Sequence, residues 1–106
     1  FSNRKHIEAP FVPEYVRQHA WYMYAIKVKK DRDLVNGQLN KKNIETRLSF
    51  PPIHTQPCYQ KIFGYNDNSF PISFSTWKSL IDIPIWPGLG KENQDHIIKA
   101  VLDLLN

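Results

Sequence analysis

Residues 44–59 read IETRLSFPPIHTQPCY, and the interpretation of the whole chain starts from this stretch. Its first seven residues alternate apolar and polar side chains, which is the two-residue period of a strand with one buried face. The double proline at residues 51–52 then opens a stiff loop that holds its side chains at small entropic cost. We expect this loop to present His54, Gln56 and Tyr59 at a binding or catalytic edge.

Two further segments have the pattern of strands. Residues 20–30 are apolar and aromatic at first, and then alternate apolar and charged side chains between Ile26 and Lys29. Residues 80–86, LIDIPIW, form a compact apolar run that is followed by a proline and two glycines. Because Pro84 has no N–H to donate, we expect this strand at a sheet edge or with one ladder bond unmade.

Two longer helices are predicted. Asp31 or Asp33 can cap a helix that passes through Leu39, and Asn43 suits the left-handed residue that ends it. Residues 91–106 form the clearest helix, because their apolar side chains recur at helical spacing. These side chains are Ile97, Ile98, Val101, Leu102 and Leu105.

The element order is strand, helix, strand, short helices, strand, helix. The short helices are expected at residues 58–63 and from Ser73 or Ser75 onward, on either side of a turn at residues 64–69. This order predicts an α+β two-layer sandwich, with a small three-stranded sheet and helices mainly on one face. A right-handed crossover would make the first two of these strands parallel, with a gap left for the third.

The chain length of 106 residues suits one domain with a modest core. Residues 1–18 contain two prolines and lack clear periodicity, so we assign them to an interdomain linker or to the end of an excised helix. Residues 19–106 are assigned to the domain itself. Since the sequence starts without an initiator Met or a targeting signal, we expect it to be a piece of a longer chain.

Composition argues against nucleic acid and membrane partners. The net charge of +4 is spread along the chain, without a basic helical stripe or an aromatic-basic strand motif that would bind nucleic acid. No apolar run approaches the roughly 20 residues that a membrane span requires. We therefore expect neither partner.

Cysteine and histidine usage predicts no metal site and no catalytic residue. Cys58 is the only cysteine, which excludes an internal disulfide and favours a reducing compartment, the cytoplasm. Without an obvious His and Asp arrangement around it, Cys58 is expected to be a small buried side chain. The four histidines lack metal-ligand spacing, and phosphate-binding glycine loops and nucleophile elbows are absent.

Three blocks of sequence carry a resemblance to a known family. They are AWYMYAIKV at residues 20–28, the stretch at 44–59, and LIDIPIWPGLG at 80–90, followed by the amphipathic terminal helix. In this order and spacing they resemble the C-terminal domain of the DegT/DnrJ family of sugar aminotransferases. The sequence departs from the family pattern at Asn43, where Gly is usual, and at Phe50, where Tyr is frequent and a hydroxyl contact is lost.

The resemblance implies a part of a pyridoxal-phosphate enzyme with the aspartate aminotransferase fold. Such an enzyme moves an amino group from an amino-acid donor, commonly glutamate, to a keto sugar carried on a nucleotide. Its aldimine lysine belongs to the N-terminal cofactor-binding domain, and no lysine here matches that surrounding sequence. We therefore expect this chain to bind no cofactor and to be inactive alone, with that N-terminal domain, a homodimer of the parent, the nucleotide sugar and the amino-acid donor as its partners.

The resemblance also implies site residues. His54 is the best candidate for a hydrogen bond to substrate, with Gln56 shaping the loop and Tyr59 supporting it from the core. Arg47 can pair with a phosphate or a carboxylate. Alternatively, His54 caps a turn and Arg47 lies on a solvated strand face.

Two rival interpretations are open. A non-catalytic ligand-binding or regulatory α+β module would share the element order, and would have a self-contained pocket. A nucleic-acid adaptor would instead bind RNA or DNA in a salt-sensitive way. Against both, a domain separated from its partner would expose an apolar patch, expected around Trp21, Trp86 and Phe70.

Overall fold

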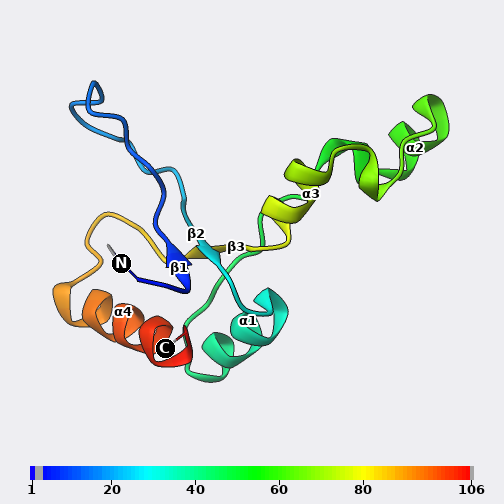
Figure 1. The fold of residues 1–106 in the computed structure, drawn as a ribbon. Helices are drawn as coiled ribbons and strands as arrows, with labels where there is room; N and C mark the ends of the chain where they lie inside the picture. Colours follow the sequence, from blue (N-terminus) through cyan, green and yellow to red (C-terminus); the bar gives the residue numbers. More distant parts are fainter. Residues whose placement is uncertain (2–3, 106) are drawn as a thin grey trace.

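The computed structural model describes residue 1 and residues 4–105 of the chain. A three-stranded antiparallel sheet packs against helices, which confirms the predicted α+β class (Figure 1). The strands are β1 (Ile7–Glu8), β2 (Tyr24–Val28) and β3 (Leu80–Ile83), in the spatial order β1-β2-β3.

Four α-helices and two short 3₁₀ helices accompany the sheet. They are α1 (Arg32–Lys41), η1 (Ile53–Thr55), α2 (Pro57–Phe63), η2 (Asp67–Ser69), α3 (Pro71–Trp77) and α4 (Lys91–Leu105). The predicted helices are all present, but α3 begins two residues before Ser73. Its first residue, Pro71, has no N–H to lose in the first turn and a φ that already suits a helix.

The sheet buries one aliphatic ridge. Ile26 of β2 lies opposite Ile81 of β3, and both side chains are fully buried. β3 is an outer strand and ends just before Pro84, as the missing N–H of that residue predicts. α1 and α4 lie on the same side of the sheet and complete the core (Figure 1). The buried hydrophobic residues are Ile7, Ile26, Val28, Val35, Leu39, Ile44, Ile81, Ile83, Ile97, Ala100, Val101 and Leu105.

The strand predicted at residues 44–50 was wrong. This segment makes only an isolated antiparallel bridge, between Arg47 and Asp82 of β3. Ile44 is buried, but Leu48 and Phe50 are 39% and 87% exposed, so the described residues leave most of the expected apolar face uncovered.

The predicted parallel pairing also fails. β2 and β3 are direct antiparallel neighbours, so the sheet has neither a crossover pair nor a gap between them. The third strand is instead β1, which comes from residues 1–18 and pairs antiparallel with β2. Ile7 of β1 is 3% exposed and belongs to the core.

Local signals define α1 as the sequence predicts. The Asp31 carboxylate accepts hydrogen bonds from the backbone amides of Asp33 and Leu34, both at 3.0 Å. These bonds satisfy two amides that lack partners within the helix. After the helix, Asn43 adopts a left-handed φ of 59°, a conformation that asparagine tolerates well.

Residues 53–77, comprising η1, α2, η2 and α3, form an arm that projects away from the sheet (Figure 1). Within the arm, α2 packs on η1, α3 packs on η2, and the two 3₁₀ helices pack on each other. No hydrophobic side chain of the arm is buried. Its exposed large apolar residues are Ile53, Tyr59, Ile62, Phe63, Phe70 and Ile72.

Candidate functional site

A hollow of about 680 Å³ opens beside the sheet, between the chain preceding β2, residues 43–47, the end of β3 and the start of α4. Its polar lining residues include Glu45, Arg47, Asp82 and His96. Its acidic and basic lining residues other than His96 are one guanidinium and two carboxylates.

Arg47 is the predicted site residue that lines this hollow. Its backbone is fixed by the bridge to β3, in which its N–H donates to the Asp82 carbonyl at 3.0 Å and its carbonyl accepts from the Asp82 N–H at 2.8 Å. Its Nε lies 3.4 Å from Asp82 Oδ2, and the Arg47 side chain stays 56% exposed. A guanidinium held through Nε can still offer its terminal nitrogens to a carboxylate or phosphate.

Asp82 is a buried acceptor that the sequence analysis missed. Only 5% of this residue is exposed, and its carboxylate accepts a 2.9 Å hydrogen bond from the Ser49 hydroxyl in addition to the Arg47 contact. The signal was present in the sequence, because Asp82 is the one charged residue within the apolar run LIDIPIW. A buried carboxylate requires such partners.

His54 lies at the centre of the arm. It is only 6% exposed, and its ring packs on Phe70 with 5.0 Å between centroids and on Phe74 with 6.4 Å. Its Nε2 is 3.4 Å from the backbone carbonyl oxygen of Asp67. In this chain the ring therefore organises η1 against η2 and α3, and little of its surface faces solvent.

Gln56 is next to His54, at the N-cap of α2. Its backbone N–H donates to the Ile53 carbonyl at 3.0 Å, and its side chain is half-buried. Among the residues that the structure describes, the Gln56 amide has no hydrogen-bond partner. The amide is therefore available to a ligand.

Two expectations for α2 were wrong. Tyr59 is 41% exposed and stacks on Phe63 at 6.1 Å rather than lying in the core. Cys58 is exposed rather than buried. Both residues lie on a helix that contributes no buried side chain, so the part of the chain that the structure describes leaves them exposed.

The three predicted site residues lie in two places. His54 and Gln56 share the arm, whereas Arg47 lies outside it and lines the hollow, which neither of the other two lines. The expected apolar residues are also dispersed. Trp86 and Phe70 are 52% and 46% exposed on a loop and on the arm, and Trp21 is partly buried, so none is enclosed.

The two hollows of the described residues do not fit the requirements of a pyridoxal phosphate site. A second, more apolar hollow of about 380 Å³ lies between Trp21, Tyr24 and α4. Among the described residues, no lysine lines either hollow, so neither offers the amine that would anchor the cofactor.

Residue 1 and residues 4–105 contain no group of three or more His, Cys, Asp or Glu side chains arranged to hold a metal ion. In the same residues, no helix has the length and apolarity to cross a membrane.

Curated relatives match nearly the whole chain. The chain is 31% identical over 102 residues to the spore coat polysaccharide biosynthesis protein SpsC of Bacillus subtilis (strain 168), covering 91% of this chain and 26% of that protein. It is 29% identical over 102 residues to the dTDP-3-amino-3,6-dideoxy-alpha-D-galactopyranose transaminase of Aneurinibacillus thermoaerophilus, covering 92% and 27%. The chain thus spans about a quarter of the length of these relatives.

Solved structures share the fold. DesV of S. venezuelae, in complex with a ketimine intermediate, has a TM-score of 0.88 at 22% identity, over 99% of this chain and 28% of DesV. NtdA of Bacillus subtilis, with bound cofactor PMP, has a TM-score of 0.79 at 23% identity, over 95% of this chain and 23% of NtdA. The family model of the DegT/DnrJ/EryC1/StrS aminotransferases matches residues 2–102. The chain belongs to the DegT/DnrJ/EryC1/StrS aminotransferase family.

Proposed function

We propose that this chain is the C-terminal small domain of a larger, pyridoxal-phosphate-dependent aminotransferase that acts on nucleotide-linked keto sugars. In the proposal, residues 19–106 are that domain, and residues 1–18 lead into it from an N-terminal domain through β1. A relative that carries the name of a dTDP-sugar transaminase, and that is about four times as long as the match, supports this view. The parent is proposed to be a cytoplasmic homodimer.

The observation that carries the proposal is the composition of the arm surface. Its six large apolar residues are between 41% and 82% exposed, and they lie in the same arm as the half-buried Gln56 and the buried His54. Exposed apolar surface of this kind marks a contact with another surface. We propose that the arm closes over the sugar-nucleotide cleft, with its apolar side chains against the N-terminal domain or the second subunit.

The proposed roles of the two domains follow from the absence of a lysine amine in the two hollows of the described residues. Pyridoxal phosphate, whose aminated form is PMP, would supply the electron sink for amino transfer. Because no lysine lines the hollows within the described residues, we place the cofactor in the N-terminal domain and expect this chain alone to be inactive. His54 and Gln56 would contact the nucleotide sugar, and Arg47 would pair with a phosphate or carboxylate of a substrate.

Kinetics of the full-length parent test this proposal. Gln56→Ala removes an amide without touching the core, so it should raise KM for the nucleotide sugar about tenfold, the usual loss for a hydrogen bond to a charged group. His54→Ala should have the same direction of effect, and cofactor absorbance should not change in either variant. Gln38→Ala, an exposed glutamine on α1, is the matched control.

The outcomes separate the candidate functions. Unchanged kinetics in both arm variants would remove His54 and Gln56 from the site. Specific binding of a small molecule by the 106-residue chain alone would instead favour a ligand-binding or regulatory module.

A further inference from the structure

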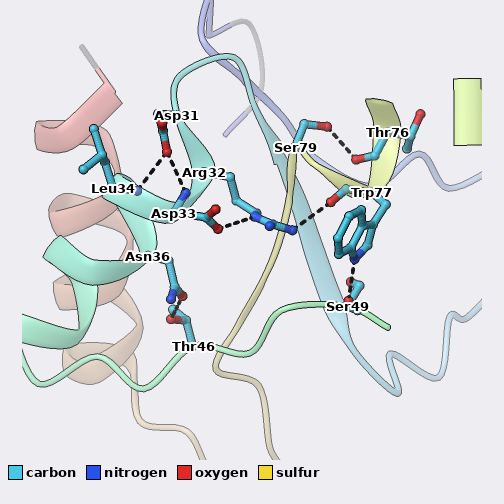
Figure 2. A network of polar contacts seen from close by, with 10 residues as sticks. All are labelled: Asp31, Arg32, Asp33, Leu34, Asn36, Thr46, Ser49, Thr76, Trp77 and Ser79. Atoms are coloured by element: carbon cyan, nitrogen blue, oxygen red, sulfur yellow. Dashed lines mark hydrogen bonds and ion pairs between the residues drawn. The ribbon is translucent and has the colours of Figure 1, made fainter. Parts of the chain in front are cut away.

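Two segments connect the arm to the rest of the chain, one entering it and one leaving it. A single side chain links these two crossings to each other. The chain passes through Ser49 shortly before it enters the arm at Ile53, and it leaves the arm after Trp77. The indole Nε1 of Trp77 donates a 2.8 Å hydrogen bond to the backbone carbonyl of Ser49, as Figure 2 shows. The entering and leaving segments are therefore held side by side at the base of the arm.

Each crossing is also bound to the body, which we define as the sheet with α1 and α4. On the leaving side, Arg32 of α1 donates from Nη1 to the Trp77 carbonyl at 3.1 Å, and its guanidinium carbon lies 5.0 Å from the centroid of the Trp77 ring (Figure 2). On the entering side, the Ser49 hydroxyl donates to the buried Asp82 of β3. We call Arg32, Ser49, Trp77 and Asp82 the clasp.

Arg32 is well suited to a fixed position. It is 8% exposed, and its Nε donates to Asp33 Oδ1 at 2.9 Å while Nη1 holds Trp77. A buried charge is tolerated only with such partners. The planar guanidinium reaches both acceptors at a fixed angle, which the single ammonium of a lysine cannot do.

We propose that the clasp sets the direction of the arm relative to the sheet, with Arg32 and Trp77 as positioning residues for His54 and Gln56. No hydrophobic side chain of the arm joins the buried core, so burial in that core does not fix the direction of the arm. Directional hydrogen bonds at the base can do so. The consequence for substrate rests on the proposed function, whereas the consequence for geometry does not.

Distances between spin labels test the geometry. The exposed Cys58 on α2 is the only native cysteine, and Lys99→Cys on α4 provides a second exposed site. Trp77→Phe keeps an aromatic ring over Arg32 but removes the bond to Ser49. We expect this variant to give a broader distribution of label distances. We also expect the base of the arm to open about fivefold more often, which would raise the hydrogen-exchange rate of the Arg47 amide that donates to the Asp82 carbonyl.

Two variants complete the design. Arg32→Lys keeps the charge, loses the fork geometry and should broaden the distances in the same way. Trp86→Phe alters a 52% exposed tryptophan outside the clasp and should leave the distances unchanged. Circular dichroism shows whether each variant retains its helices.

In the full-length parent, Trp77→Phe should raise KM for the nucleotide sugar with kcat little changed. Broader distances with unchanged kinetics would support the clasp and count against the proposed role of the arm in substrate binding. The clasp would be overturned if both folded clasp variants gave distributions of label distances as narrow as that of the labelled chain without a clasp substitution.

Discussion

The body and the arm are built in opposite ways. The body and the adjoining Ile44 together contain the entire cluster of buried hydrophobic residues, contributed by β1, β2, β3, α1, α4 and Ile44. In the arm, the buried residue is a histidine, and the large apolar side chains face outward. The body is therefore stabilised by its own burial, whereas the arm presents a surface whose burial requires another part of the protein.

The arm owes its shape to local signals. Pro57 and Pro71 begin its two α-helices, and Gly64 ends α2 with a left-handed φ of 69°. A capping box between Asn66 and Ser69 caps the start of η2. These devices specify a shape over a few residues each, but they bury little apolar surface.

The strongest test of this contrast removes a buried side chain from the body. Leu39→Ala should lower the free energy of unfolding by about 2–5 kcal/mol, because Leu39 is fully buried and its removal leaves a cavity. Urea denaturation measures the loss. Leu34→Ala on the same helix is the control, since Leu34 is 66% exposed. Equal effects of the two substitutions would contradict the assigned core.

The next effect concerns the junction between the two regions. Asp82→Ala should cost about 1–3 kcal/mol of unfolding free energy, because the Ser49 hydroxyl and Arg47 lose their shared acceptor. Thermal unfolding followed by circular dichroism measures this loss. Asp103→Ala, at an exposed position of α4, should have little effect. A neutral Asp82→Ala would show that the side-chain contacts of Asp82 with Ser49 and Arg47 are dispensable.

A smaller effect is expected at the start of α1. Asp31→Ala should destabilise the chain by about 1 kcal/mol, because the amides of Asp33 and Leu34 lose their cap. Asp31→Asn retains an acceptor and should recover most of that stability in the same denaturation experiment. If alanine and asparagine are equivalent, the cap does not contribute.

The smallest effect should come from the arm. Ile62 is 71% exposed, so Ile62→Ala should change the unfolding free energy of the 106-residue chain by less than about 0.5 kcal/mol. In the full-length parent the same substitution should cost more, because the proposed contact buries this side chain. A large loss in the chain alone would mean that the arm has a core of its own.

Elements with local signals could be predicted from the sequence. Asp31 and Asn43 marked the ends of α1, and the helical spacing between Ile97 and Leu105 marked α4. Pro84 placed β3 at an outer position of the sheet. Each of these features depends on residues close together in the chain.

The predictions were wrong where contacts between residues far apart in the sequence determine the structure. The sequence of residues 44–50 alternates like that of a strand. The segment nevertheless pairs with β3 only at Arg47, and its Leu48 and Phe50 side chains stay exposed. β1 is two residues long, too short to give a period. The clasp links residues 28 or more positions apart, so neither Arg32 nor Trp77 had a signal in the sequence.

Amide hydrogen exchange, compared between the 106-residue chain and the full-length parent, tests the central claim most directly. The informative amides are Gln60 in α2 and Phe74 in α3, which bond within the arm, and those of β2 serve as the internal reference. If the arm docks on the remainder of the parent, its amides exchange much more slowly in the full-length protein while β2 is unchanged. Equal exchange of the arm amides in both proteins would contradict the claim.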